Sequence, residues 1–253
     1  MDTQSPFLLS VVMPAYNEAA TVGDVIDAVL ALSTLFPLEL IVVNDGSTDD
    51  TPLIIDRCND ARLRVLHHES NLGKGAAVRT GLAEVRGSHV LIFDADLEYD
   101  VNDIARLVDP ILSGRAEVVY GNRMSGYGTV HPSLMHAVGN HVMTATANIF
   151  FNCAISDLHT CLKLLPKPML DSFTLRETGF GLDTEISAEM LRSGFRPYEI
   201  PISYVGRSHE EGKKIGVIDA LRCVYVLVKV RLRGSTPYGR RNKALSPRTS
   251  IAQ

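Results

Sequence analysis

The chain has 253 residues, of which 45% are hydrophobic and 21% are charged. These fractions are ordinary for a globular protein and exclude a chain that is disordered throughout. Arg222 and Lys229 interrupt the longest apolar run, Ala220–Val230, so no run reaches the roughly 18–20 residues of a membrane-spanning helix. The cysteines form no CxxC pair, which favours reduced thiols of a cytosolic protein over a zinc site: Cys58, Cys153, Cys161 and Cys223.

The net charge of −4 is unevenly distributed along the chain. From Val205 onwards there are eleven Lys and Arg residues against three Asp and Glu residues, so the preceding residues carry −12. A basic segment beside an apolar one suits phosphate groups, anionic lipid or nucleic acid, and an ordinary solvated tail is the alternative. Ser, Pro, Gly and Arg dominate after Gly234, so we expect a flexible basic tail at 234–253.

The first half of the chain alternates between apolar runs rich in β-branched residues and segments with helical periodicity. The apolar runs predict strands at Leu8–Pro14, Leu38–Asn44, Leu63–His67, His89–Phe93 and Glu117–Gly121. The periodic segments predict helices at Thr21–Leu32, Gly75–Val85 and Asp103–Leu112, and another with Pro52 at its first position and Asp49 or Thr51 as its cap. This alternation is typical of βαβ units, and therefore of an α/β protein with a parallel sheet.

The second half of the chain is expected to continue the same domain. Its pattern predicts helices at His136–Phe151 and Asp183–Leu191, a strand at Tyr198–Tyr204 and an amphipathic last helix at Val217–Arg231. No linker interrupts this pattern, so we predict one domain that covers residues 1–233.

Polar clusters follow three of the predicted strands, at Pro14–Glu18, Asp45–Asp49 and Asp94–Glu98. The carboxyl ends of parallel strands meet at one edge of the sheet, where such folds bind their ligands. The three clusters therefore predict a binding site at that edge.

The cluster Asp94-Ala95-Asp96-Leu97-Glu98 suits a divalent cation. Carboxylates at alternate positions can converge on a hard cation, and substrate phosphate oxygens and water can complete its shell. An isolated D-x-D pattern is also compatible with a solvated turn. The buried strand before it and the two companion loops favour metal binding.

Two further segments combine glycine with basic residues. Asn71–Gly75 opens a helix like a phosphate-binding loop, although it lacks the P-loop spacing, and a tight turn at the helix start is the alternative. Arg207, Lys213 and Lys214 lie in a glycine-containing loop and suit a leaving diphosphate or a phosphorylated acceptor. No aromatic residues alternate with these basic residues, which argues against nucleic acid.

Together these motifs resemble family 2 of the GT-A glycosyltransferases, and within it the branch of dolichol-phosphate mannose synthase and the bacterial polyprenyl-phosphate glycosyltransferases. The resemblance extends from about Ser10 to Arg233. It implies a GT-A fold, which is a mostly parallel Rossmann-like sheet flanked by helices, here with the C-terminal amphipathic helix. Residues 1–120 would form the nucleotide-sugar and metal half, and residues 121–233 the acceptor half.

The resemblance also implies roles for residues of the first half and of the basic loop. The residues that it assigns to the nucleotide-sugar are Pro14, Ala15, Tyr16, Glu18, Asp45, Lys74, Asp94, Ala95, Asp96, Arg207 and Lys213. It assigns Mg²⁺ or Mn²⁺ to Asp94, Asp96 and Glu98.

In the second half, Gly121-Asn122-Arg123 resembles the segment whose arginine contacts the acceptor phosphate. Arg123 and Lys163 would hold the acceptor, and Asp157 would position groups, or act as the base if the acceptor were a hydroxyl. The implied catalytic residues are therefore Asp94, Asp96, Arg123 and Asp157. The segment Asn140–Lys163 resembles the membrane-surface helix of the branch, followed by a loop that contains an aspartate.

The function implied is the inverting, metal-dependent transfer of a hexose or N-acetylhexosamine from a UDP- or GDP-sugar to a polyprenyl phosphate. The protein would then lie in the cytoplasm against the inner membrane face. His131 and His136 stand where the mannose synthases carry a second arginine, and Glu98 replaces their usual glutamine, so a UDP-sugar is at least as plausible as GDP-mannose. Alternatives are a soluble or hydroxyl-bearing acceptor, a nucleotidyltransferase and a non-catalytic nucleotide-sugar binder. The oligomeric state stays open.

Overall fold

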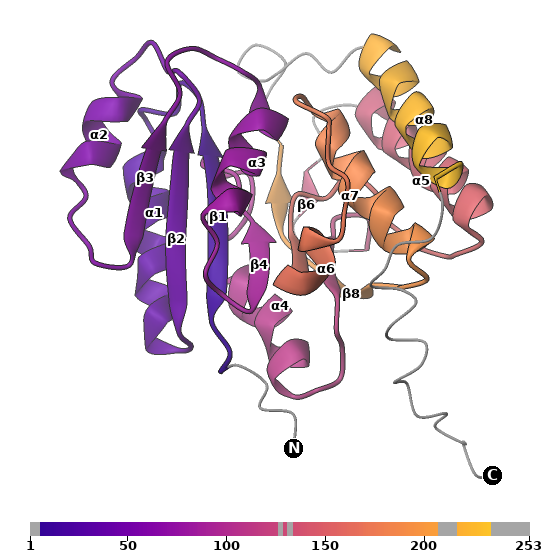
Figure 1. Cartoon of the computed structure of the whole chain (residues 1–253), viewed down its shortest axis with the longest axis horizontal. Helices are drawn as coiled ribbons and strands as arrows, with labels where there is room; N and C mark the ends of the chain where they lie inside the picture. Colours follow the sequence, from indigo (N-terminus) through magenta and orange to yellow (C-terminus); the bar gives the residue numbers. More distant parts are fainter. Residues whose placement is uncertain (1–5, 126–128, 131–133, 207–216, 234–253) are drawn as a thin grey trace.

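The computed structural model of the chain describes residues 6–125, 129–130, 134–206 and 217–233. Within these residues, a seven-stranded sheet with the order β3-β2-β1-β4-β7-β5-β8 is flanked by helices (Figure 1). A separate two-stranded sheet pairs β6 with β9. The predicted α/β class with a mostly parallel sheet is confirmed.

All but one of the strands in the large sheet run in the same direction. Those strands are β1 (Leu9–Ala15), β2 (Leu38–Asn44), β3 (Leu63–His67), β4 (His89–Ile92), β5 (Val119–Asn122) and β8 (Tyr198–Pro201). The antiparallel strand is β7 (Lys163–Pro166), which lies between β4 and β5. Every residue of the central strand β1 is buried, as expected for an apolar strand whose sheet is covered on both faces.

The register of the central strands aligns the loops that follow them. Val12 of β1 pairs with Ile41 of β2 on one side and with Ile92 of β4 on the other. The three strands therefore end at the same edge of the sheet, and the polar clusters that follow them begin there.

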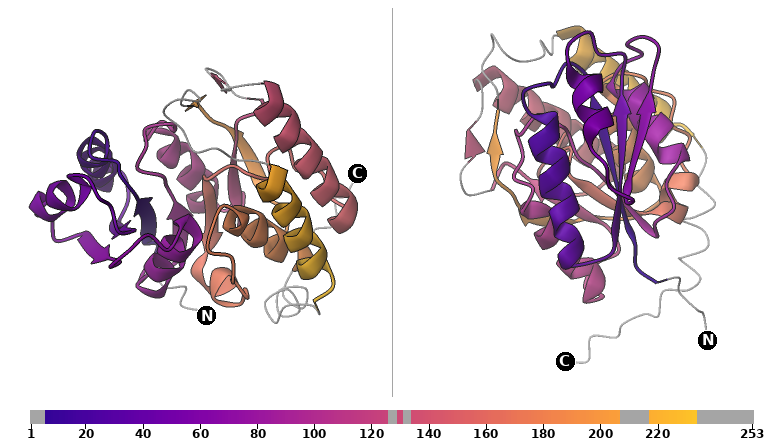
Figure 2. Two further views of the ribbon diagram at one scale, coloured as in Figure 1. Left: turned by 90° about the horizontal axis from the view of Figure 1, so that it is seen from above. Right: turned by 90° about the vertical axis from the view of Figure 1, so that its left-hand side faces the viewer.

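The helices form layers around this sheet. They are α1 (Val22–Ala31), α2 (Thr51–Arg57), α3 (Lys74–Ala83), α4 (Asp103–Leu112), α5 (Leu134–Phe151), α6 (Lys167–Asp171), α7 (Gly181–Arg192) and α8 (Val217–Arg231), with a 3₁₀ turn at Leu32–Thr34. Helices α1 and α3 cover opposite faces of the sheet (Figure 2). Helix α7 packs beside α3, and α8 and α5 pack on α7 from outside.

Three local predictions need correction. The strand predicted at Tyr198–Tyr204 divides into β8 and β9 (Tyr204–Val205), and β9 pairs with β6 (Thr129–Val130). Strand β7 was not predicted. Asp50 occupies the N-cap position of helix α2 without a side-chain cap hydrogen bond, and Thr51 is already helical. The carboxylate of Asp49, one of the two predicted caps, accepts a hydrogen bond from the amide of Thr51 at 3.0 Å.

Membrane-spanning helices and disulfides can be assessed for the described residues only. No helix among them is both long and apolar enough to cross a membrane. Their four cysteines are all free.

Candidate functional site

The loops after β1 and β2 are joined by hydrogen bonds centred on Asn17. The amide of Asn17 donates to Ser47 Oγ at 3.0 Å, and its side-chain oxygen accepts from the amide of Thr48 at 2.8 Å. Asn17 has φ 55°, a left-handed conformation that asparagine tolerates better than most residues. The two loops therefore form one continuous wall at the carboxyl edge of the sheet.

Asp45 connects this wall to the segment before α3. One carboxylate oxygen of Asp45 accepts from the amide of Leu72 at 3.0 Å and lies 2.7 Å from His68 Nδ1. The other oxygen accepts from the amide of Gly73 at 2.8 Å. The buried Asp45 side chain therefore determines the shape of the loop that presents Lys74.

Gly73 allows this loop to approach the acceptor half of the chain. It has φ 96°, and a Cβ atom at this position would lie 2.5 Å from the carbonyl oxygen of Thr178. Only glycine fits this close approach in this conformation. The beginning of α3 is thereby held against the segment that leads into α7.

Thr21 connects the first loop to the acidic cluster. Its hydroxyl donates to the carbonyl oxygen of Ala95 at 2.7 Å and lies 3.1 Å from Glu18 Oε2. Thr21 was not predicted as a site residue, because in the sequence it appears only as the start of a periodic helix.

The acidic cluster itself is a turn of unusual backbone conformation. Leu97, between Asp96 and Glu98, has φ 57°, which is uncommon for a residue other than glycine and typical of strained functional turns. Asp96 accepts from the amide of Glu98 at 3.2 Å, and Glu98 Oε2 accepts from the Tyr204 hydroxyl at 3.1 Å. Burial, together with the charges of Asp94 and Glu98, raises the pKa of Asp96 to about 7. A cation beside Asp96 would relieve this repulsion.

The donor set fits a metal that is completed by its substrate. Among the described residues, no group of three or more His, Cys, Asp or Glu side chains could hold a metal ion by itself. A cation on a sugar diphosphate commonly uses only one or two protein carboxylates, with phosphate oxygens and water as its other ligands. Asp94 and Asp96 match that pattern, whereas Glu98 is engaged with Tyr204.

Lys74 lies between two carboxylates. Its Nζ is 2.7 Å from Asp94 Oδ2 and 3.6 Å from Asp183 Oδ2. Burial alone would lower the pKa of Lys74, but Asp183 and Asp94 raise it well above its ordinary value, so the ammonium is charged. Asp183 was predicted only as the first residue of a helix and not as a site residue, because no local sequence pattern connects it with Lys74.

Lys163 occupies the interior rather than a surface. Its side chain is fully buried, 3.4 Å from Asp183 Oδ1 and 5.5 Å from the centre of the Tyr120 ring, and it also donates to the carbonyl oxygen of Thr160. An acceptor phosphate cannot reach this ammonium without displacing the surrounding chain. The direct acceptor contact expected of Lys163 is therefore not supported.

Arg123 and Asp157 form a two-bonded ion pair. Arg123 Nε and Nη2 donate to the two Asp157 oxygens at 2.7 and 2.8 Å, and the amide of Arg123 and the side chain of Asn140 donate to the same carboxylate at 3.2 and 2.9 Å. Burial would raise the pKa of Asp157, but the guanidinium of Arg123 outweighs it and holds the pKa well below its ordinary range. Asp157 is thus ionised and accepts four hydrogen bonds, which suits a positioning group better than a base.

The remaining side of Arg123 faces an aromatic pair next to the acidic turn. Its Nη1 lies 3.4 Å from the Tyr99 hydroxyl, and its guanidinium carbon is 5.0 Å from the centre of the Tyr204 ring. Because Tyr204 also bonds Glu98, Arg123 and the acidic turn share one neighbour. This is one of the contacts between the first and second halves of the chain.

The other predicted site residues fall into two groups. Pro14 and Ala15 are buried at the end of β1, and Tyr16 and Glu18 are half-buried in the loop that follows. The predictions for His131, Arg207, Lys213, Lys214 and the flexible tail at 234–253 lie outside the described residues.

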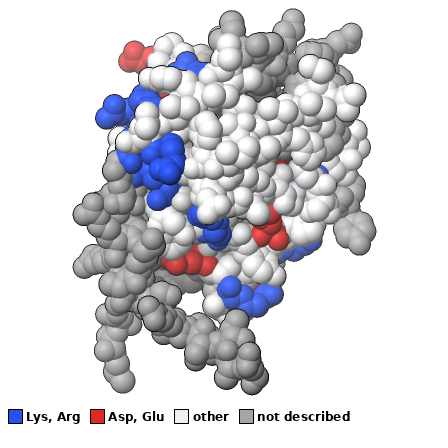
Figure 3. Space-filling view, turned by 90° about the vertical axis from the view of Figure 1, so that its right-hand side faces the viewer, with Lys and Arg blue, Asp and Glu red and all other residues white. Residues whose placement is uncertain are grey.

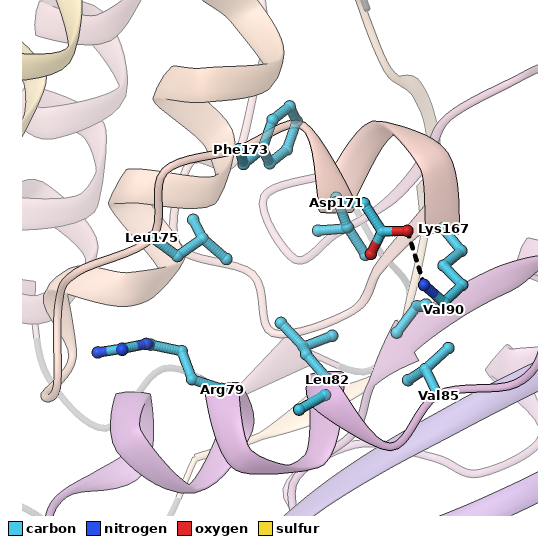
Figure 4. A pocket seen from close by; sticks show the side chains of 10 residues that line it. Arg79, Leu82, Val85, Val90, Lys167, Asp171, Phe173 and Leu175 are labelled. Carbon is cyan, nitrogen blue, oxygen red and sulfur yellow. Dashed lines mark hydrogen bonds and ion pairs between the residues drawn. The ribbon is translucent and has the colours of Figure 1, made fainter.

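A separate shallow pocket of about 250 Å³ lies between α3 and α6 (Figure 4). Arg79, Leu82 and Leu175 line it, together with Lys167 and Asp171, which form an ion pair of 2.6 Å. It contains none of the predicted site residues, and Lys167 bonds to Ser88, before β4, at the opposite end of the sheet from Asp94. We therefore assign the site to the carboxyl edge.

Known proteins resemble the chain in sequence and in fold. The sequence model of glycosyl transferase family 2 matches residues 10–173. The hexosyltransferase Agl6 of low-salt glycan biosynthesis in Haloferax volcanii is 31% identical over 80% of this chain and 49% of its own length. The dolichyl-phosphate beta-glucosyltransferase of Saccharomyces cerevisiae is 29% identical over 88% of this chain and 74% of its own length. Glucosyl-3-phosphoglycerate synthase of Mycobacterium tuberculosis superposes with a TM-score of 0.70 at 22% identity, covering 91% of this chain and 83% of that enzyme.

The chain has a fold of the GT-A type, with its acidic turn at the carboxyl edge of the sheet, and the family match makes it a glycosyltransferase. It belongs to glycosyl transferase family 2. The chain spans 33%, 49% and 65% of the length of three Haloferax volcanii relatives, AglD, Agl6 and AglJ. Structures of the mycobacterial synthase hold UDP with Mn²⁺ or Mg²⁺.

Proposed function

We propose that this glycosyltransferase transfers a hexose or N-acetylhexosamine, with inversion, from a UDP- or GDP-sugar to a polyprenyl phosphate. The observation that carries the proposal is that the Asp157 carboxylate, the base expected for a hydroxyl acceptor, already accepts four hydrogen bonds and is not available as a base. The names of the yeast and Trichomonas vaginalis relatives, both dolichyl-phosphate glucosyltransferases, support the same acceptor class. They make UDP-glucose the first donor to test.

The donor half would act through charge. Asp94 and Asp96 would hold Mg²⁺ or Mn²⁺, which supplies neutralisation of the charge that develops on the leaving diphosphate. The wall formed by residues 14–18 and 45–49 would bind the nucleoside, and Asp45 would keep the loop of Lys74 in the shape that faces the diphosphate. These groups are aligned before substrate arrives, so little reorganisation is required.

The acceptor half discriminates between a phosphate and a hydroxyl. A phosphate monoester is already ionised at neutral pH and can attack the anomeric carbon without a general base, whereas a hydroxyl needs one. Neither Asp157 nor His159 is available for that task. His159 is half-buried with both ring nitrogens engaged by Asn140 and Thr184. Desolvation together with Lys163 lowers its pKa to about 4. A phosphate acceptor therefore suits the site, and Arg123 Nη1 would face it.

An exposed apolar face supports an acceptor with a lipid tail. Exposed apolar residues recur at helical spacing on α5 and along α8, and they are Leu134, Met135, Val138, Val142, Ile149, Leu221, Tyr225, Val228 and Leu232. Helix α8 packs a second row of apolar residues against α7. The exposed apolar residues of α8 are therefore a different set from those that hold it to the fold. The side of the molecule that carries α5 and α8 is mostly uncharged, and the charged residues visible on it, Lys and Arg together with some Asp and Glu, lie mainly in the left and lower parts of the view (Figure 3). Such a face suits peripheral contact with a membrane.

The proposal is tested by comparing acceptors. The enzyme is incubated with labelled UDP-glucose or GDP-mannose, Mn²⁺, and either a polyprenyl phosphate, the matching polyprenol or 3-phosphoglycerate. We expect labelled lipid only with the polyprenyl phosphate, release of a nucleoside diphosphate, and an anomeric configuration opposite to that in the donor. Equal transfer to the polyprenol would refute the phosphate acceptor. Release of pyrophosphate would instead indicate a nucleotidyltransferase.

A further inference from the structure

Four charged side chains form a continuous row from the acidic turn into the interior. Asp94 contacts Lys74 at 2.7 Å, Lys74 contacts Asp183 at 3.6 Å, and Asp183 contacts Lys163 at 3.4 Å. Lys74, Asp94 and Asp183 retain only 12%, 16% and 11% of their side-chain exposure, and Lys163 retains none. The four side chains come from separate segments: the turn after β4, α3, α7 and β7. Because their charges alternate in sign, the net charge of the row is zero.

Lys74 is the member of the row that contacts both carboxylates. Lys163 is enclosed, and its ammonium fixes one oxygen of Asp183. The ammonium of Lys74 contacts Asp94 and the other oxygen of Asp183. Because it lies at the end of a flexible four-carbon chain, it can shift between the two carboxylates. Asp94 is also a carboxylate to which the proposed function assigns a divalent cation.

We propose that Lys74 and the divalent cation compete for Asp94, and that Asp183 receives the lysine ammonium when the cation binds. This inference rests on the proposed metal site. A divalent cation on Asp94 would strongly repel the ammonium that already contacts this carboxylate, because charges are weakly screened in a partly buried setting. Asp183, held by Lys163, is a second carboxylate within reach of Lys74, so the ammonium keeps a partner without leaving the site.

The same row links the metal to the donor. A divalent cation alone would leave the row with two excess positive charges. The charges on the diphosphate of a nucleotide-sugar cancel this excess, and those of a nucleoside diphosphate such as UDP more than cancel it. The cation should therefore bind weakly by itself and more tightly with UDP. Lys74 would thus prevent an empty enzyme from retaining metal and would favour joint binding of metal and donor.

The test measures Mn²⁺ binding without any turnover, from the electron paramagnetic resonance signal of free Mn²⁺. In Lys74→Met, Mn²⁺ should bind about tenfold or more tightly than in the wild type when no nucleotide is present, because the competing charge is gone. The gain in Mn²⁺ affinity caused by UDP should be smaller in this variant than in the wild type. Lys74→Gln serves the same purpose if the methionine variant does not fold.

The matched control is the exposed pair of Lys167 and Asp171 on α6, at the other end of the sheet. Lys167→Met removes the same charge and should leave Mn²⁺ affinity within about twofold of wild type, because solvent and salt screen distant charges. A gain in this control as large as that in Lys74→Met would indicate a general charge effect and overturn the competition.

Asp183 is tested by a change that preserves net charge. Replacing Lys163 and Asp183 together by Met and Asn removes one positive and one negative charge and leaves no unpaired buried lysine. With Lys74 present, this double change should weaken Mn²⁺ binding, because the lysine then has only Asp94 to bind. In the Lys74→Met background it should have no effect. Equal weakening in both backgrounds would overturn the role of Asp183 as the receiving carboxylate.

Failure of this inference can be told from failure of the proposed function. Wild-type Mn²⁺ affinity in a folded Lys74→Met variant, with Mn²⁺ still bound by both proteins, would overturn the competition alone. Absence of Mn²⁺ binding in every form, with and without UDP, would overturn the metal site and the competition together.

Discussion

Arg123 and Asp157 illustrate how a residue expected to bind substrate also serves the fold. Their side chains are joined by two hydrogen bonds, and Asp157 is fully inaccessible to solvent. The guanidinium fork that the sequence assigned to a phosphate is therefore largely occupied by a carboxylate. A loss of activity on changing Arg123 could therefore result from damage to the fold as well as from a lost substrate contact. The free energy of unfolding of the variant must be measured alongside its activity.

We predict that Asp157→Ala lowers the free energy of unfolding by about 3–5 kcal/mol, because it leaves a buried guanidinium without its partner. Urea denaturation measures this change. Asp171→Ala, which removes the partner of Lys167 from an exposed pair, should change the free energy of unfolding by no more than about 1 kcal/mol. Similar small losses in both variants would show that the Arg123 pair contributes little to the fold.

At the same scale, the positions predicted best were those fixed by local sequence. Asp94 and Asp96 were expected just beyond a buried apolar strand, and they follow β4 in the structure, while their role in metal binding stays a prediction. The contacts of Thr21 and Asp183 were not, since their partners lie 74 and more than 100 residues away, and only the folded chain brings them together. Lys163 was misjudged for the same reason, because a lysine in a sequence gives no sign that a buried aspartate will pair with it.

At the scale of elements, periodicity predicted most of the sheet and its helices. It failed for β7 (Lys163–Pro166), which is too short for a periodic pattern. This strand also begins with a charged residue and ends with a proline. The position of β7 is determined by pairing with β4 and β5, which no local pattern reports. Apolar residues at Leu221, Tyr225 and Val228 likewise indicate an apolar stripe on α8, but only the structure reveals that this stripe faces outward.

The outward stripe of α8 gives a prediction for membrane contact. Leu221→Glu with Tyr225→Glu should abolish sedimentation with anionic vesicles, because two charges oppose burial of the stripe in lipid. Transfer to a detergent-solubilised acceptor should be retained. Glutamate at the exposed Leu53 of α2 and the exposed Leu35, just after the 3₁₀ turn that follows α1, should leave vesicle binding unchanged. Helices α1 and α2 lie on the opposite side of the molecule from α8 (Figure 1). Full vesicle binding by the α8 variant would assign α8 no membrane role.

At the scale of the whole molecule, two halves meet around one carboxyl edge. The first half brings the loops after β1, β2 and β4 together. The second half contributes Arg123 just after β5, Asp157 from the loop after α5, and Asp183 from α7. The family was recognisable from motifs in the sequence. The connection between the halves, through Tyr204 and Lys74, required the structure.

The most direct measurement is Mn²⁺-dependent transfer of labelled glucose from UDP-glucose to a polyprenyl phosphate by wild type, Asp96→Asn and Asp100→Asn. Asp100 is an exposed aspartate four residues beyond Asp96 and matches the change in charge. The account predicts that Asp96→Asn loses transfer by about a hundredfold or more, the range typical for loss of one electrostatic contact to the leaving group, while Asp100→Asn keeps it. A folded Asp96→Asn enzyme with wild-type transfer at limiting Mn²⁺ would contradict it.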